Sequence, residues 1–173
     1  VLLNGNYFVY EDIPKSYLIV NLIYKSPEYF LLTYIIFMAT FVNSNKFYKK
    51  KFFLFNYKLL LITSLVIFPF LLLFFTPFSI YDGLRHVLWM LPYICVIPAL
   101  AIYYLIENIN SIKTKLTLSL LSLLIGYFLF NFFLLTPYQY TYLNILSGKP
   151  ESRYKKFEND YWGASIKELI NKT

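Results

Sequence analysis

The sequence contains few residues that bind metal ions or form disulfides. Its 173 residues include one cysteine, one histidine and two methionines. The single Cys95, which lies in an apolar run, excludes a disulfide framework and a thiolate metal cluster within these residues. Because His86 is the only histidine, a metal site would have to consist mainly of carboxylates.

Charged residues are also scarce. They make up 14% of the chain, whereas ordinary soluble domains are about 25% charged and about 45–50% apolar. Here 58% of the residues are hydrophobic and 22% are aromatic. A soluble domain of this composition would expose large apolar patches, and an intrinsically disordered chain would need low hydrophobicity. The composition therefore predicts an integral membrane protein.

Four apolar runs approach the ~20 residues that a membrane-spanning helix needs. They cover roughly residues 27–42, 59–75, 87–106 and 116–135. We expect an all-α integral membrane fold with about four transmembrane helices over residues 27–135. An extracytoplasmic or interfacial loop (residues 1–26) precedes them and an extracytoplasmic segment (residues 136–173) follows. For the first and shortest run, a buried helix of a soluble domain is the alternative.

Serine and proline residues mark the expected helices. Ser26, Pro27 and Glu28 have the pattern of an N-cap, a first helical residue and an acid near the positive end of the helix dipole. We expect Pro92 inside the third span, where neighbouring helices can satisfy the carbonyl that a proline frees. Residues 165–168 have the spacing of a capping box, which predicts the start of a short helix.

The lysines indicate how the spans are oriented. The loop at residues 43–58 has five lysines and no acid, and the loop at 107–115 has two lysines and one glutamate. The positive-inside rule assigns both loops to the cytoplasm, and both ends of the chain to the outside. Nucleic acid is not an expected partner of this chain of net charge +7, because the lysines cluster at the ends of the apolar runs. Residues 1–25 and 137–144 are rich in tyrosine and too short in apolar length to span, so we expect them at the membrane interface.

The first candidate site is the pair Arg85 and His86, at the outer end of the third span. Arginine can hold a phosphate through two parallel hydrogen bonds, and histidine can add a donor. A pair just below the headgroups suits a lipid phosphate. The alternative is an arginine that only anchors a helix end by reaching to the interface. Asp82 has the spacing of an ion-pair partner for Arg85 or of a helix cap, and a catalytic base is a further alternative.

The second candidate site follows residue 157. Carboxylates bind sugar hydroxyls and aromatic rings stack on sugar rings, so we expect this segment on the sugar or acceptor side. Its alternative is an acidic turn whose aromatic residues dock on the membrane interface. The residues of this second site are Glu158, Asp160, Tyr161 and Trp162.

Signatures of soluble enzymes are absent from the sequence: it has no glycine-rich phosphate loop, HExxH or GxSxG motif.

Four short segments carry a resemblance to a known family: Asp12 to Leu18 before Ser26-Pro27; Tyr81 to His86 leading to Leu91-Pro92; Pro137-Tyr138, Tyr142 and Asn144; and Glu158, Asp160 to Gly163 and Ser165. Together they resemble the C-terminal part of bacterial polytopic glycosyltransferases of the GT-C superfamily. That group includes relatives of the protein O-mannosyltransferases (glycosyltransferase family 39) and of the lipid A aminoarabinose transferase. One departure is Lys15, where the family usually has tryptophan.

The resemblance implies transfer of a sugar, with inversion, from a polyprenyl-phosphate donor to an acceptor at the outer face of the bacterial cytoplasmic (inner) membrane. Arg85 and His86 would then bind the lipid phosphate. The family places its catalytic carboxylate in an early outer loop. We therefore expect no catalytic residue in this chain, which would be a fragment whose missing N-terminal part supplies the base. No cofactor is expected, and a divalent metal requirement stays open.

Two other functions fit the same composition. One is a non-enzymatic polytopic membrane scaffold whose aromatic residues serve only as interface belts. The other is a segment of a transporter or flippase with proline-kinked helices. The spans contain almost no ionisable residues, which disfavours transport, because transport pathways usually carry some.

Overall fold

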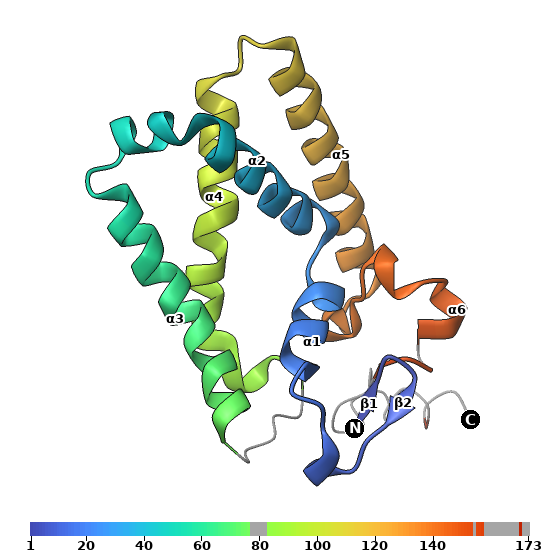
Figure 1. Cartoon of the computed structure of the whole chain (residues 1–173). Coiled ribbons are helices and arrows are strands. Elements are labelled where there is room, and N and C mark those ends of the chain that lie inside the picture. The colour runs from blue at the N-terminus through green and yellow to red at the C-terminus, as the bar shows by residue number, and fades with distance from the viewer. Residues whose placement is uncertain (77–82, 154, 158–169, 171–173) are drawn as a thin grey trace.

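The computed structural model describes residues 1–76, 83–153, 155–157 and 170. The chain is mostly helical (Figure 1). A two-stranded antiparallel hairpin, β1 (Leu2–Leu3) and β2 (Asn6–Tyr7), precedes the helices and pairs Leu2 with Tyr7 and Leu3 with Asn6. Its turn uses Asn4 and Gly5, both with positive φ, as a tight hairpin turn requires. In the residues expected as an interfacial segment, the fold thus has a hairpin and then helix α1 (Tyr17–Lys25).

The long helices follow in sequence. They are α2 (Glu28–Lys51), α3 (Phe55–Phe75), α4 (Leu91–Glu107), which the 3-10 helix η2 (Arg85–Met90) precedes without a break, and α5 (Ile112–Leu134). Short elements complete the described part: the 3-10 helices η1 (Tyr10–Asp12), η3 (Gln139–Thr141) and η4 (Ile145–Ser147), and α6 (Pro150–Arg153).

One local prediction was wrong and another was confirmed. Ser26 is not the N-cap of α2: it is extended (φ −80°, ψ 139°), ends α1 and leaves Pro27 at the N-cap. A residue before proline is forced toward this extended region, which explains the shift. Pro92 does lie inside the third predicted span, in the first turn of α4, which begins at Leu91. There the missing N–H costs nothing.

In the described part of the chain, three helices are long and apolar enough to cross a membrane, by length and composition. They are Phe55–Phe75, Arg85–Glu107 and Ile112–Leu134, and they contain the second and third predicted spans and most of the fourth. The apolar part of α2 ends at Val42, where four polar residues follow, and α2 is not among the three. A first span at 27–42 therefore stays a prediction. Only 6% of the apolar stretch of α5 is buried inside the chain, so its surface needs lipid or further protein around it.

The helices divide the molecule into two ends (Figure 1). The ends of α2 and α4 and the starts of α3 and α5 lie toward one end of the molecule, and we call residues 43–58 and 107–115 the lysine-rich end. The hairpin, α1 and the segment after α5 lie at the opposite end, and we call residues 1–26 and 136–157 the terminal layer. The two loops predicted to be cytoplasmic thus share one end, while the side of the membrane that each end faces stays a prediction.

Each end has its own apolar cluster. The larger one joins the terminal layer to α3, η2 and α4, and it includes Leu18 (0% exposed), Met90 (0%) and Phe157 (2%). The smaller one lies near the lysine-rich end and consists of Phe37, Tyr48, Phe55 and Ala101. The terminal layer therefore packs on the helices rather than extending away from them.

Candidate functional site

Arg85 and His86 lie at the beginning of η2, and both side chains are exposed. The next residue, Val87, is 4% exposed, and Met90, one 3-10 turn later, is completely buried. These two apolar side chains hold the turn against the larger cluster. The pair is thereby presented outward at the start of the candidate span Arg85–Glu107. The backbone of η2 leaves helical geometry at Val87 (φ −123°, ψ 18°) before α4 begins.

The start of α1 holds both ends of the loop that precedes this pair. The backbone N–H of Gly83 donates to the Tyr17 hydroxyl at 2.7 Å, and Lys15 Nζ donates to the carbonyl of Thr76 at 2.8 Å. Gly83 has a φ of +66°, which a residue with a Cβ adopts at a cost. Lys15, the departure from the family pattern, therefore has a structural contact of its own, and Tyr17 ties the terminal layer to the Arg85 helix start.

Asn144 is the most completely bonded side chain of the terminal layer. It is 0% exposed, and its Nδ2 donates to the carbonyls of Ile23 (2.6 Å) and Ser26 (2.8 Å). Its Oδ1 accepts from Leu146 N–H at 3.1 Å, and its own N–H donates to the Tyr24 carbonyl at 2.9 Å. The last carbonyls of a helix have no partner within it. Asn144 supplies partners for α1 from a segment far along the chain.

Glu28 makes a second long-range link. Its Oε2 accepts a hydrogen bond from the Tyr142 hydroxyl at 2.7 Å, and its Oε1 accepts one from Ile145 N–H at 2.8 Å. Burial, together with the bond to the Glu28 carboxylate, raises the pKa of the Tyr142 phenol far above its ordinary value. Sequence reasoning assigned Glu28 only to the helix dipole, and this pairing was missed because the partners are 114 positions apart.

Arg153 and Lys156 bond to backbone carbonyls of the segment that leads to the second candidate site. Arg153 Nε donates to the Gly148 carbonyl (3.1 Å) and its Nη1 to the Leu143 carbonyl (2.9 Å), while Lys156 Nζ donates to the Ser147 carbonyl (2.8 Å). Phe157 then packs beside Tyr24, with ring centroids 5.1 Å apart. Two basic residues of the C-terminal segment are thus used inside the terminal layer.

The second candidate site lies outside the described residues. So does Asp82, and so does the short helix predicted to start at residues 165–168. The structure brings Arg85 and His86 to the same end as Tyr142 and Asn144, and it places Phe157, just before the second site, in the same cluster as η2. The residues of the second candidate site, which lie outside the described part, are Glu158, Asp160, Tyr161 and Trp162.

Among the described residues, no group of three or more His, Cys, Asp or Glu side chains could hold a metal ion.

An apolar cavity of about 260 Å³ opens beside the terminal layer. Side chains of α1, α2, α3 and α4 line it, among them Leu22, Phe30, Phe70 and Ile94. The Tyr34 hydroxyl donates to the Ile94 carbonyl at 2.6 Å and forms part of the wall. Because η2 runs directly into α4, the same helical stretch carries the exposed Arg85 pair and a wall of this cavity. Such an arrangement can bind an anion that has an apolar chain attached.

Comparison with known proteins found no matching family model, no matching curated protein and no matching solved structure.

Proposed function

We propose that the chain is part of a polytopic membrane glycosyltransferase of the GT-C type. In this proposal it transfers a sugar from a polyprenyl-phosphate donor to an acceptor at the outer face of a bacterial inner membrane. The observation that carries the proposal is the exposed pair Arg85 and His86 at the start of a candidate span, on the end that also contains the terminal layer. The apolar cavity beside that layer supports it, because a polyprenyl chain needs an apolar surface next to its phosphate.

The reaction needs a group that stabilises a leaving phosphate. The acceptor hydroxyl attacks the anomeric carbon, the bond from that carbon to the lipid-phosphate oxygen breaks, and the electron pair stays on the phosphate. Arg85 would stabilise the charge that develops there, and His86 would add a hydrogen bond. Donors placed where charge develops contribute several kcal/mol to catalysis. The acceptor proton would go to a carboxylate in an early outer loop, as the resemblance implies.

The terminal layer would position the sugar side of the site. Asn144 and Glu28 hold the start of the segment 142–157 against α1 and α2. Arg153 bonds back to the Leu143 carbonyl within that segment. The chain leaves this layer at the buried Phe157 and goes on directly to Glu158. In the proposal, the carboxylates and rings at 158–162 contact the sugar or the acceptor.

The test is Arg85→Ala in the full-length enzyme, with Arg85→Lys beside it. Hydrogen bonds to charged groups are worth about 1.5–3 kcal/mol, so we expect kcat/KM to fall roughly ten- to a hundredfold and binding of the donor to weaken. Lysine, a point charge without the planar fork, should restore only part of this. Lys113→Ala, at the lysine-rich end, is the matched control. Unchanged donor affinity and turnover in Arg85→Ala would exclude the phosphate role.

A further inference from the structure

The tip of α2 departs from the direction of the rest of the helix. At Ser44 the backbone leaves helical geometry (φ −133°, ψ 30°), and residues 45–51 continue as a separate helical piece. In Figure 1 this piece runs across the neighbouring helix ends rather than along them. The Ser44 hydroxyl lies 3.2 Å from the Tyr104 hydroxyl, and the Tyr48 hydroxyl lies 2.7 Å from Thr40 Oγ1. These contacts fix the direction of the tip.

Aromatic rings hold the inner side of the tip. Tyr48 is completely buried and stacks on Phe55, with centroids 5.2 Å apart and planes 11° from parallel. Phe47 meets Tyr104 edge to face at 5.1 Å. Pairs of this kind add about 0.5–1.5 kcal/mol beyond their buried area. The tip is therefore a packed element with a defined outer side.

The corner that follows the tip, with the first turn of α3, combines exposed apolar residues with the lysines of this end. Phe53 is 78% exposed, Leu54 50% and Tyr57 73%. Leu54 has a positive φ of 52° at the corner between α2 and α3, a conformation that a leucine rarely adopts. Apolar side chains presented next to lysines match the composition of segments that lie in the headgroup region. There the apolar groups enter the acyl boundary and the ammonium groups reach the phosphates.

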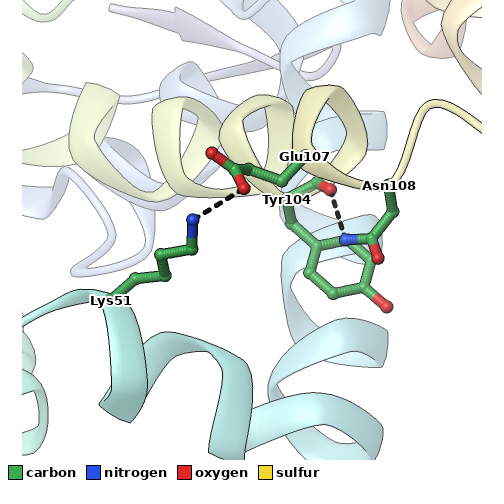
Figure 2. Close-up of polar contacts among 4 residues, drawn as sticks. All are labelled: Lys51, Tyr104, Glu107 and Asn108. Atoms are coloured by element: carbon green, nitrogen blue, oxygen red, sulfur yellow. Dashed lines mark hydrogen bonds and ion pairs between the residues drawn. The ribbon is translucent and has the colours of Figure 1, made fainter.

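The charge of this end is almost entirely positive. Glu107 is the only acid in residues 43–58 and 107–115, and it accepts a hydrogen bond from Lys51 at 2.7 Å (Figure 2). Next to it, Asn108 Nδ2 donates to the Tyr104 carbonyl at 2.8 Å and completes the end of α4 (Figure 2). With Lys51 paired, the exposed lysines that remain are Lys46, Lys49, Lys50, Lys58, Lys113 and Lys115.

We propose that the lysine-rich end binds the headgroups of anionic phospholipids, with the α2 tip lying in the headgroup plane. Clusters of four to eight basic residues directly next to membrane spans are typical of such binding. The exposed apolar side chains of Phe53 and Leu54 favour a lipid surface as the partner over an acidic protein or a nucleic acid. Of the three, only a lipid surface has an acyl region directly next to its anionic groups. This proposal does not depend on the proposed sugar transfer.

The experiment uses the full-length protein in a neutral detergent, titrated with phosphatidylglycerol or with phosphatidylcholine of the same acyl chains. Binding is measured by native mass spectrometry and by the unfolding midpoint. We expect preference for phosphatidylglycerol, and we expect Lys49→Gln/Lys50→Gln to weaken its binding roughly thirtyfold. That factor follows from about 1 kcal/mol per lysine near an anionic surface and 1.4 kcal/mol per tenfold change. The charge-matched control, Lys149→Gln/Lys155→Gln in the terminal layer, should retain the preference.

A second measurement avoids mutation. In the unmodified protein the preference should shrink strongly between about 0.1 and 1 M salt, since the screening length falls from about 10 to 3 Å. Equal binding of the two lipids, or equal losses in the two double variants, would overturn the proposal. Stabilisation by a polyglutamate peptide but not by phosphatidylglycerol would overturn it too and assign the surface to an acidic protein.

Discussion

The two ends of the molecule use charge in opposite ways. In the terminal layer, Arg153 and Lys156 bond to backbone carbonyls of the layer itself, and Glu28 at the start of α2 accepts hydrogen bonds from the layer. At the lysine-rich end, Lys51 pairs with Glu107, and its neighbours Lys49 and Lys50 extend outward from the α2 tip as exposed side chains. The first end uses charge to fix its own shape, and the second offers charge to its surroundings. Substitutions should therefore cost folding stability at the terminal layer and affect binding at the lysine-rich end.

The largest effect on stability is expected from Asn144→Ala. It would leave the Ile23 and Ser26 carbonyls and the Leu146 N–H without this partner inside the layer. A buried group without a partner costs about 1–3 kcal/mol, so a loss of roughly 3 kcal/mol or more is expected. The measurement is the unfolding midpoint of the full-length protein in detergent.

The matched control for that change is Asn131→Ala. Asn131 also donates to a carbonyl, that of Tyr127 four residues earlier, but on an exposed helix face. Surface changes of this kind usually stay within about 0.5 kcal/mol. Equal losses of stability in the two variants would mean that Asn144 does not hold the terminal layer on α1 in the way that its contacts indicate.

An intermediate effect is expected from breaking the pair Glu28 and Tyr142. A double-mutant cycle of Glu28→Gln and Tyr142→Phe should give a coupling of about 1 kcal/mol, because the two side chains share one charge-assisted bond. A coupling near zero would mean that the bond adds nothing to the layer.

The same pair should give a pH dependence. The native pKa of Tyr142 is raised, so its contribution is complete below about pH 10, the ordinary pKa of an unfolded tyrosine, and is lost as the pH rises further. Tyr142→Phe should therefore lose less stability than the unmodified protein between pH 8 and pH 11.

The smallest effect is expected from Lys51→Gln. The ion pair with Glu107 is exposed, and exposed pairs contribute little because water and salt screen them. The unfolding midpoint should hardly change, and Glu107→Gln should behave in the same way. A large loss in either variant would contradict the contrast between the two ends.

Sequence patterns predicted the helices better than their limits. The apolar runs located α3, α4 and α5, but α3 begins at Phe55 and α5 at Ile112, about four residues before the predicted spans. Hydropathy reports the apolar core, whereas a helix continues through polar residues such as Lys58 and Lys113. At the C-terminal end of α2, the helix likewise extends past the apolar part as far as Lys51, with a break in helical geometry at Ser44.

The candidate site was predicted only in part. The exposed position of Arg85 and His86 at a helix start follows from their place before an apolar run. The bonds of Glu28 and Asn144 could not be predicted, because they join residues more than 100 positions apart and no local pattern encodes such a pairing. Sequence reasoning did single out Tyr142 and Asn144 through the resemblance, without indicating their partners.

The contact between Asn144 and α1 has a consequence for the order of folding. Its side chain reaches back 121 positions to Ile23, and all four long helices lie between the two partners. A chain made from its N-terminus exposes the end of α1 until those helices have been synthesised. The terminal layer is thus completed late, after the four long helices, and a chain that stalls within α5 would have most of these helices without the layer.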